Sequence, residues 1–295
     1  MSDLNLADMS GRAVVITGGN TGIGKATAEA LASVGARVVV TSRDPLRGAA
    51  AVDEIKRASD NDQVEQLGLD LASLRSVRSC AEVLRERIDS IAVLDLNAGG
   101  VLSSRRVTED GFEMQFQVNH LGHFLLTHLL LDRLTGGRVV VVSSWGHTQA
   151  RHGLDFEDLQ WERRPYRGSP VYGATKLMNL YFAFELARRF EAKETGTTAN
   201  ALHPGFVATQ FGHGGDTRML GLGIRIARPF ARSAEKGARS AVWLAASPDA
   251  AGLNGRYVID CRPAKPSKAA LDVAAAERLW TVSEQLAGIV NPQSA

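Results

Sequence analysis

The sequence predicts a single α/β domain in which about seven parallel strands form a doubly wound sheet with helices on both faces. Short runs rich in Val and Ile alternate with segments of helical periodicity along all 295 residues. The runs are continuously apolar, as expected of strands that are covered on both faces. No linker, repeat or low-complexity tract interrupts this alternation, so residues 1–295 are predicted to form one domain rather than two.

The predicted strands are short apolar runs, each followed by a turn or a polar residue. They cover Ala13–Thr17, Arg37–Thr41, Gln63–Gly68, Ile91–Asn97, Gly137–Ser143, Thr197–Leu202 and Arg256–Asp260. Periodicity and capping residues predict the helices Gly24–Val34, one that starts at Asp44-Pro45, Ser73–Arg87, Glu113–Leu134, Val171–Glu191 and Ala234–Ala246. Gly35 is the expected left-handed cap of the first helix, and Asp44 is the expected N-cap of the second.

Three segments depart from this alternation. A polar and aromatic insertion covers about residues 145–170, and a loop rich in Gly and Arg covers about residues 210–233. Long loops in compact domains usually carry function, so we expect both to border the substrate, with a disordered excursion as the alternative. Residues 267–286 predict a terminal amphipathic helix with Trp280 on its apolar side.

The composition excludes several classes of protein. Lys and Arg total 34 against 32 Asp and Glu, and this net charge of +2 does not indicate a nucleic-acid partner. Cys80 and Cys261 have no metal-type spacing, so neither a disulfide framework nor a metal site is predicted. No apolar run reaches the roughly 18 residues of a membrane span, and the first ten residues do not resemble a signal peptide. We therefore expect a cytoplasmic protein.

A glycine-rich turn, TGGNTGIG at residues 17–24, lies between the first strand and the first helix. Glycines there allow a tight turn and a close approach of the backbone to a pyrophosphate, and the helix N-terminus offers unpaired N–H groups. The alternative is a purely structural turn, but the strand-turn-helix context predicts a Rossmann-like dinucleotide site. Its expected contacts are Gly18, Asn20, Thr21, Gly22, Ile23 and Gly24.

The end of the second strand predicts which dinucleotide is bound. An enzyme that uses NAD carries an acidic residue there, whereas this chain has Ser42 and Arg43. A hydroxyl and a guanidinium suit the 2′-phosphate of NADP(H), which an acid would repel. Lys25 is expected to add a second cation, and Asp44 is a better helix cap than a ribose ligand.

Tyr172 and Lys176 are four residues apart and therefore share one face of a helix. An ammonium about 5 Å from a phenol contributes roughly 3 kcal/mol toward the phenolate, so Lys176 is expected to supply most of the shift of the tyrosine pKa toward neutrality. Ser143 and Ser144 lie at the carboxyl end of a predicted strand, where open α/β sheets bind ligands. A serine hydroxyl there can hold a carbonyl oxygen beside the tyrosine.

Taken together, the motifs resemble the short-chain dehydrogenase/reductase family. They are TGGNTGIG, LNAG at residues 96–99, QVNHLGHFLLT, VVVVSS, YGATK and HPGFVAT, in the family order along nearly the whole chain. NTGIGKATA, DFEDLQ, ELARRF, DCRP and ERLWTVSEQL resemble more narrowly the retinol dehydrogenase and WW-domain oxidoreductase-like branch, which favours NADP(H).

The resemblance implies roles for the matching residues. Tyr172 would be the general acid and base, Lys176 would bind the nicotinamide ribose, and Ser144 would hold the carbonyl oxygen, with Ser143 as the adjacent alternative. Asn119 would complete a proton relay through water and Lys176. Further implied cofactor contacts are Asp70 and Leu71 near the adenine, Asn97, Ala98 and Gly99 along the adenosine channel, and Pro204, Gly205, Val207 and Thr209 near the carboxamide.

These patterns predict an oxidoreductase that transfers a hydride between NADP(H) and a small carbonyl or alcohol. The aromatic residues Trp145, Trp161, Phe206 and Phe211 favour a lipophilic aldehyde, ketone or secondary alcohol as substrate. The alternative is a catalytically idle NADPH sensor or scaffold on the same fold. A homo-oligomer through the apolar stripe of Phe124, Leu125, Leu129 and Leu130 is left open beside core packing. The histidine pairs His120 with His123 and His147 with His152 lack acidic or cysteine partners, so metal binding is not expected.

Overall fold

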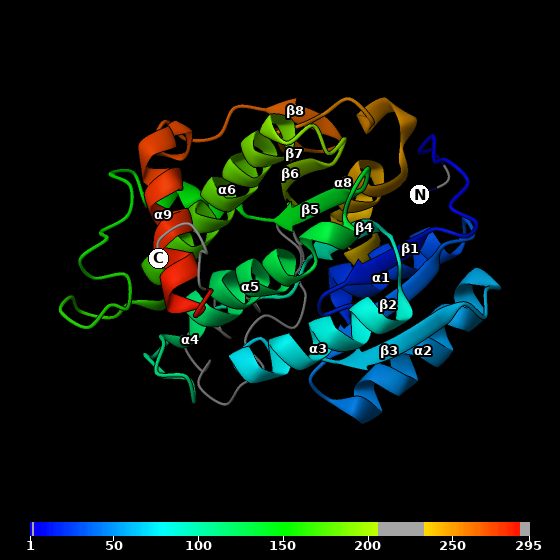
Figure 1. Ribbon diagram of the computed structural model, residues 1–295, viewed down its shortest axis with the longest axis horizontal. Coiled ribbons are helices and arrows are strands. Elements are labelled where there is room, and N and C mark those ends of the chain that lie inside the picture. Colours follow the sequence, from blue (N-terminus) through cyan, green and yellow to red (C-terminus); the bar gives the residue numbers. More distant parts are fainter. Residues whose placement is uncertain (2, 206–232, 290–295) are drawn as a thin grey trace.

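Eight strands of the described chain form one sheet in the order β3-β2-β1-β4-β5-β6-β7-β8 (Figure 1). The computed structural model describes residues 1, 3–205 and 233–289. The strands are β1 Ala13–Ile16, β2 Arg37–Ser42, β3 Val64–Gly68, β4 Ile91–Leu96, β5 Arg138–Val142, β6 Thr198–His203, β7 Tyr257–Ile259 and β8 Arg262–Ala264. All neighbours are parallel except β7 and β8. This Rossmann-like topology confirms the predicted fold class.

The antiparallel edge strand β8 was not expected from the sequence. It contains only three residues, one of them proline, and pairs with β7 through a two-residue turn. Asp260 and Cys261 of this turn both have positive φ, at 48° and 59°. Tight hairpins prefer Asn-Gly at such positions, so the sequence lacked the usual signal for a hairpin.

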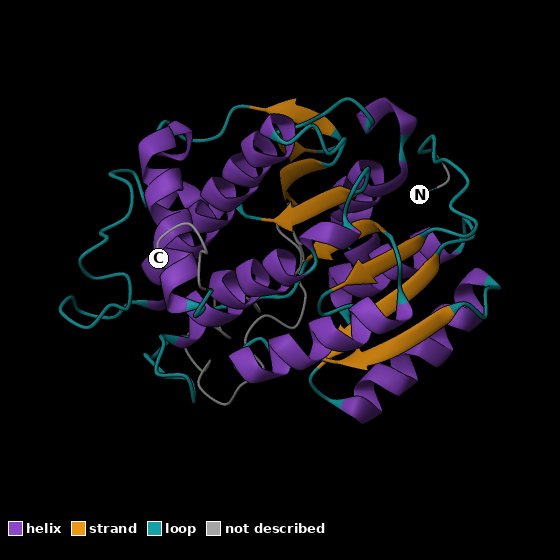
Figure 2. Cartoon of the chain, in the orientation of Figure 1, coloured by secondary structure: helices purple, strands orange, loops and turns teal. Residues whose placement is uncertain are grey.

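Helices cover both faces of the sheet (Figure 2). The helices α1 Gly22–Ala32, α2 Pro45–Ser59 and α8 Ala234–Ala246 enclose one core, and α3 Leu74–Arg87, α5 Gly122–Leu129, α6 Gly168–Ala192 and α9 Val273–Leu286 enclose the other. The Asp44 carboxylate accepts from the Leu46 and Arg47 amides and caps α2 as predicted. Gly35 is left-handed, with φ of 89°, two residues after the C-cap Ser33.

The single helix predicted over residues 113–134 is wrong. The structure divides it into α4 Met114–Phe116, a π-helical turn Gln117–Leu121, α5, and a 3-10 turn Leu131–Arg133. Such one-turn π segments are rare and are frequently found at functional sites. Here the π turn contains Asn119.

The terminal helix begins later than predicted, after a 3-10 turn at Ala269–Leu271. The Asp272 carboxylate caps α9 by accepting from the Ala275 amide. Trp280 packs edge-on against Phe124, with ring centroids 4.9 Å apart, and is stacked on Phe182 at 6.0 Å. The apolar stripe of α5 is therefore covered by α9, which supports core packing at that face.

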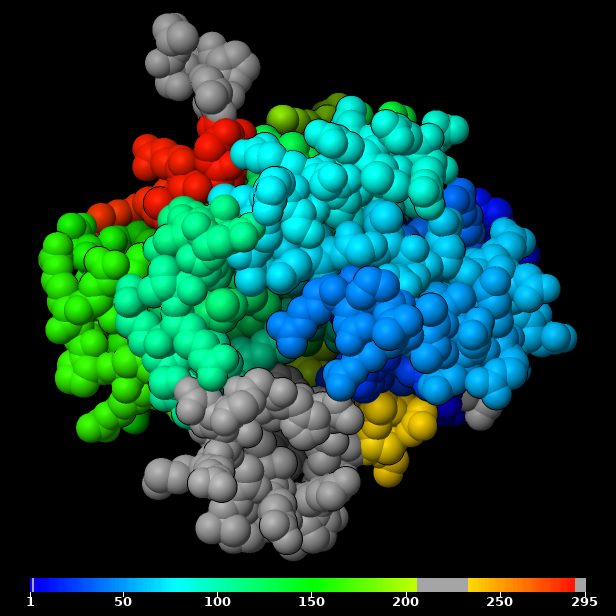
Figure 3. Space-filling model, turned by 90° about the horizontal axis from the view of Figure 1, so that it is seen from below, coloured from blue at the N-terminus to red at the C-terminus, as the bar shows by residue number. Residues whose placement is uncertain are grey.

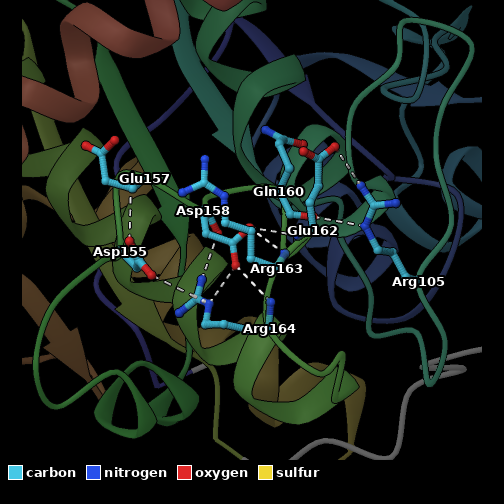
Figure 4. A network of polar contacts seen from close by, with 8 residues as sticks. All are labelled: Arg105, Asp155, Glu157, Asp158, Gln160, Glu162, Arg163 and Arg164. Atoms are coloured by element: carbon cyan, nitrogen blue, oxygen red, sulfur yellow. Dashed lines mark hydrogen bonds and ion pairs between the residues drawn. The ribbon is translucent and has the colours of Figure 1, made fainter.

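The predicted insertion at 145–170 is folded around one buried carboxylate. It begins with a 3-10 turn, η3, at Trp145–Gln149 and ends in the first turn of α6. Asp158 accepts from the backbone amides of Glu162, Arg163 and Arg164 and from the Arg164 guanidinium (Figure 4). The predicted loop at about 210–233 lies outside the described residues, apart from its final position.

Candidate active site

The candidate site lies at the carboxyl edge of the sheet, beside the point where the strand order reverses between β1 and β4. Open α/β sheets bind ligands in the crevice at this point, because the loops that leave the two strands diverge there. A cavity of about 190 Å³ is lined by Gly18, Asn20, Thr21, Gly22, Ile23, Asn97, Ala98, Gly99, Val142, Ser143, Tyr172, Lys176 and Pro204. The cavity therefore unites the two halves of the site that the sequence predicted separately.

The glycine-rich turn has the geometry of a nucleotide cradle. Gly18 has a positive φ of 64°, and a Cβ at Gly24 would lie 2.6 Å from the Gly18 carbonyl oxygen. Thr21 precedes α1 without capping it through its side chain, so the first amides of the helix remain available to an anion. A dinucleotide pyrophosphate fits this arrangement of backbone N–H groups.

Thr17 ties the two nucleotide loops together. Its buried hydroxyl accepts from the Ala98 amide at 3.0 Å and lies 2.9 Å from Nε2 of His123. Asn97 donates through Nδ2 to the Thr17 carbonyl at 2.9 Å. These contacts fix Asn97 and Ala98 against the glycine turn, as the adenosine channel requires.

Lys25 was predicted to offer a second cation to the phosphate, but its ammonium is already paired with carboxylates. Its ammonium pairs with Glu54 of α2 at 2.5 Å and with Glu29 of its own helix, α1, at 3.3 Å. The Ser42 hydroxyl is also occupied, because it donates to the Asp44 carbonyl at 2.9 Å and accepts from the Asp44 amide. Arg43 is exposed and has no ion-pair or hydrogen-bond partner among the described residues. Of the three predicted phosphate contacts, Arg43 alone has its side chain available.

Other predicted cofactor contacts surround the same edge of the sheet. Asp70 accepts from the Ala72 amide at 3.0 Å and shapes the loop after β3, and Leu71 is buried. Gly205 follows β6 with φ of 82°. Pro204 lines the cavity, whereas Val207 and Thr209 lie outside the described residues and remain predictions. Seen from below (Figure 3), the blue N-terminal part of the chain and the green insertion lie at opposite ends of the view.

Of the two adjacent serines, Ser144 is the one that meets the tyrosine. The Ser143 hydroxyl is buried and donates to the Lys176 carbonyl at 2.7 Å, which leaves it a structural role. The Ser144 hydroxyl accepts from the Gly146 amide at 3.1 Å and forms a side-chain hydrogen bond with Tyr172. The geometry therefore favours Ser144 as the group that holds a substrate oxygen.

Lys176 lies beneath the tyrosine, with Nζ 5.5 Å from the ring centroid of Tyr172. The ammonium donates to the Val142 carbonyl at 2.9 Å, and burial lowers its pKa to about 8, so it remains mostly protonated at pH 7. Burial raises the pKa of Tyr172 to about 12, against the lowering effect of the Ser144 hydrogen bond. The expected shift of this pKa toward neutrality, most of it from Lys176, is not seen in the chain without nucleotide, because desolvation of the phenol dominates.

Asn119 connects the π turn to the catalytic helix. Its Nδ2 donates to Thr175 Oγ1 at 3.0 Å and to the Gly100 carbonyl at 2.9 Å, and its Oδ1 accepts from the Gly100 amide at 2.8 Å. Thr175 in turn donates to the Tyr172 carbonyl at 2.9 Å. The structure thus places Asn119 beside the tyrosine helix and close to Lys176, since a Cβ on Gly99 would touch both side chains.

Sequence reasoning missed the supporting contacts. His123, considered only as a metal candidate, is buried between Thr17 and the Asn119 carbonyl, and burial lowers its pKa to about 3. His147 was considered in the same way, but it contacts the Ser144 backbone. The sequence indicated these roles only by position, since His123 is four residues after Asn119 and His147 is three residues after Ser144. Within the described residues, no group of three or more His, Cys, Asp or Glu side chains could hold a metal ion.

Comparisons with known proteins agree with this geometry. The model of the short chain dehydrogenase family matches residues 12–154. Mouse (Mus musculus) retinol dehydrogenase 12 is 43% identical over 282 residues, which cover 95% of this chain and 87% of that protein. A candidate daunorubicin C-13 ketoreductase of Streptomyces sp. (strain C5) is 41% identical over 280 residues, covering 95% and 94% of the two chains. The chain belongs to the short-chain dehydrogenase/reductase family, in the retinol dehydrogenase branch, and is an oxidoreductase that acts on CH–OH groups.

Solved structures show the same fold. A structure of an uncharacterized protein from Mycobacterium paratuberculosis aligns with a TM-score of 0.78 and 36% identity, covering 97% of this chain and 96% of that one. A blue fluorescent protein from a metagenomic library, solved in complex with NADPH, aligns with a TM-score of 0.66 and 26% identity, covering 85% and 97%. Of the helices in the described part of this chain, none is long and apolar enough to cross a bilayer.

Proposed function

We propose that this chain is an NADP(H)-dependent carbonyl reductase or alcohol dehydrogenase that acts on a lipophilic aldehyde, ketone or secondary alcohol in the cytoplasm. The observation that carries this proposal is the hydrogen-bonded pair of Ser144 and Tyr172, with buried Lys176 beneath it, beside the cavity that the glycine turn lines. A protein that only sensed the nucleotide would not need this proton-transfer arrangement.

The residues divide the chemistry between them. Ser144 would hold the substrate oxygen by a hydrogen bond, and Tyr172 would donate its proton to that oxygen as a carbonyl is reduced. When bound, the nicotinamide would supply or accept the hydride. The Tyr172 phenol is protonated at neutral pH, as its role as the proton donor in reduction requires. Lys176 stabilises the phenolate left after proton transfer, and Asn119 orients the tyrosine helix through Thr175.

Two observations support the finer parts of the proposal. Arg43 is exposed at the end of β2 and available to a 2′-phosphate, in a position where an acidic residue would favour NAD. Trp145 is 58% exposed directly after Ser144, which places a large apolar surface beside the reacting group. An aromatic wall next to the substrate oxygen favours lipophilic substrates.

Replacement of Tyr172 by Phe tests the proposal. We expect Tyr172→Phe to lower kcat by about a hundredfold or more for any carbonyl that the wild type reduces, because the general acid is lost. The dissociation constant of NADPH, measured by fluorescence titration, should stay within about twofold. Tyr181→Phe is the matched control, because Tyr181 lies on the same helix, is buried, and among the described residues bonds only the Ala269 carbonyl.

Retained turnover in Tyr172→Phe would remove this tyrosine from the chemistry. Wild-type protein that binds NADPH but reduces no member of a diverse panel of aldehydes and ketones would favour the idle sensor instead.

A further inference from the structure

His147 is three residues after the proposed catalytic serine, in the 3-10 turn η3 that follows β5. Its side chain is only 1% exposed, and its ring packs edge-on against Tyr257 with centroids 5.3 Å apart. The proposed chemistry does not use this histidine, and no ion-pair partner in the described residues explains its burial. A polar ring in such a place is stable only when its nitrogens are hydrogen-bonded.

Both ring nitrogens have backbone partners whose roles are fixed. Nδ1 lies 2.7 Å from the Ser144 carbonyl oxygen, and Nε2 lies 3.0 Å from the Ser267 amide nitrogen. A carbonyl only accepts and an amide N–H only donates, so the ring must carry its proton on Nδ1 and none on Nε2. Burial lowers the pKa of His147, which is consistent with this neutral form.

The first of these bonds acts on the backbone of the serine. The Ser144 carbonyl accepts from the His147 backbone amide at 3.1 Å as well as from the ring. The other polar group of the same peptide bond, the Trp145 amide, donates to Nδ1 of His203 at 3.2 Å. Ser144 itself has an extended backbone, with φ of −161°, and its hydroxyl is directed to Gly146 and Tyr172. The direction of that hydroxyl depends on how the peptide that follows it is held.

The second bond links this turn to a distant part of the chain. Ser267 lies between β8 and the 3-10 turn Ala269–Leu271, and the Ala270 amide bonds its hydroxyl at 3.4 Å. Through Nε2, His147 is therefore fixed on a segment that continues into α9. A ring held at both ends has one orientation, and this orientation is transmitted to the serine.

We propose that His147 is a positioning residue that holds the Ser144 backbone through Nδ1 and takes its own orientation from the Ser267 backbone through Nε2. The proposal rests on the proposed roles of Ser144 and Tyr172. Its function is to keep the serine hydroxyl within reach of the tyrosine and the substrate oxygen, because small displacements of a reacting geometry lower the rate steeply.

Three substitutions of His147 distinguish the effect of the Nδ1 bond to Ser144 from that of the Nε2 bond to Ser267. His147→Asn retains an N–H donor close to the position of Nδ1, His147→Gln retains an acceptor close to that of Nε2, and His147→Phe keeps the ring but neither polar atom. His152→Phe is the control, because His152 is an exposed histidine of the same insertion. Each variant is assayed as the full chain for NADPH-dependent reduction of a carbonyl that the wild type accepts, with NADPH affinity and melting temperature measured on the same samples.

We expect kcat to fall roughly tenfold or more in His147→Phe and less in His147→Asn than in His147→Gln, with NADPH affinity within about twofold throughout. Because the Ser144 hydrogen bond lowers the pKa of Tyr172, the pH midpoint of alcohol oxidation should rise in the order Asn, Gln, Phe. If His147→Phe does not fold, the comparison of Asn with Gln decides the question alone.

Equal kcat in Asn and Gln, or a loss in His147→Phe that follows melting temperature without a shift in the pH midpoint, would overturn the positioning role. Ser144→Ala is measured in parallel. Unchanged kcat in Ser144→Ala would contradict the proposed function itself, so the two failures can be told apart.

Discussion

Arg43 and Lys25 are two basic residues near the glycine turn, yet the structure gives them different surroundings. Lys25 pairs with Glu29 and Glu54, whereas Arg43 has no partner in the described part of the chain. A cation that already neutralises two carboxylates offers little to a third anion. If the proposed cofactor NADP(H) is bound, recognition of its 2′-phosphate would depend on the Arg43 side chain, and cofactor preference would be sensitive to a single substitution.

Arg43→Asp should weaken NADPH binding at least about tenfold while changing NADH binding by less than about threefold, because the new carboxylate repels the 2′-phosphate and can bond a free ribose hydroxyl. Isothermal titration with both nucleotides measures the two affinities. Arg57→Asp carries the same charge change at the far end of α2 and should alter neither. An equal loss of NADPH and NADH affinity in Arg43→Asp would contradict the assignment.

Whether a site residue could be predicted depends on whether its contacts are local in sequence or reach distant residues. Ser144, Tyr172 and Lys176 could be named from the sequence because they lie at strand ends or share one helix face. The sequence could not show that Lys25 and Ser42 already have partners, because these contacts depend on Glu54 of the neighbouring helix and on the path of the backbone at Asp44. The raised pKa of Tyr172 likewise reflects burial, which spacing does not report.

Among the elements, the insertion at 145–170 shows how a segment with little regular secondary structure is held in one shape. The Asp158 side chain is 5% exposed and accepts from three amides and one guanidinium. Gln160 adds two links to the rest of the chain, because its carbonyl accepts from Arg105 and its side chain accepts from the Glu113 amide. This arrangement favours a fixed conformation of the insertion over a disordered excursion.

Asp158→Asn should loosen the insertion, because an amide presents a donor where the wild type presents only acceptors. The loss is on the order of 2 kcal/mol of local stability, so trypsin should cut after Arg163 about tenfold faster or more. Glu157→Gln, which changes an exposed carboxylate of the same loop, should leave the rate unchanged. A cleavage rate in Asp158→Asn equal to that of the wild type would show that other contacts hold this loop.

The sequence predicted the regular elements better than the irregular ones. Strand and helix periodicity located the parallel strands, because continuous apolar runs and caps are local signals. The π turn at Gln117–Leu121 and the hairpin turn at Asp260–Cys261 have no local signal of that kind. Both are stabilised by contacts with distant residues, such as the bond from the Cys261 amide to Ser240 Oγ and that from Asn119 to Thr175.

At the scale of the whole molecule, the sheet separates two cores, and one of them contains an acid. Asp95 is on β4, paired with Ile16 of β1 and Val140 of β5, and is 1% exposed. Neither carboxylate oxygen has a hydrogen-bond partner in the described structure, and burial raises the pKa of Asp95 from 3.8 to about 7. The folded protein therefore favours the neutral acid.

This acid makes global stability depend on pH. The folded pKa of Asp95 is higher than the unfolded one. Its contribution to the free energy of unfolding is therefore fully present below about pH 3.8 and is lost as pH rises through about 7. The wild type should thus lose about 2 to 3 kcal/mol relative to Asp95→Asn between pH 5 and pH 8. Urea unfolding of both proteins at the two pH values measures this difference, and parallel pH profiles would contradict a protonated buried acid.

The packing of α9 on α5 and α6 also bears on the order in which the chain can finish folding. Phe124 and Phe182 are made long before Trp280, and β6, α8 and the β7–β8 hairpin are synthesised in between. Until α9 emerges from the ribosome, this aromatic face has no cover, and an exposed apolar face promotes aggregation of nascent chains. A chain stalled before α9 therefore has a nearly complete nucleotide fold with an exposed aromatic face, and chaperones are expected to bind that face.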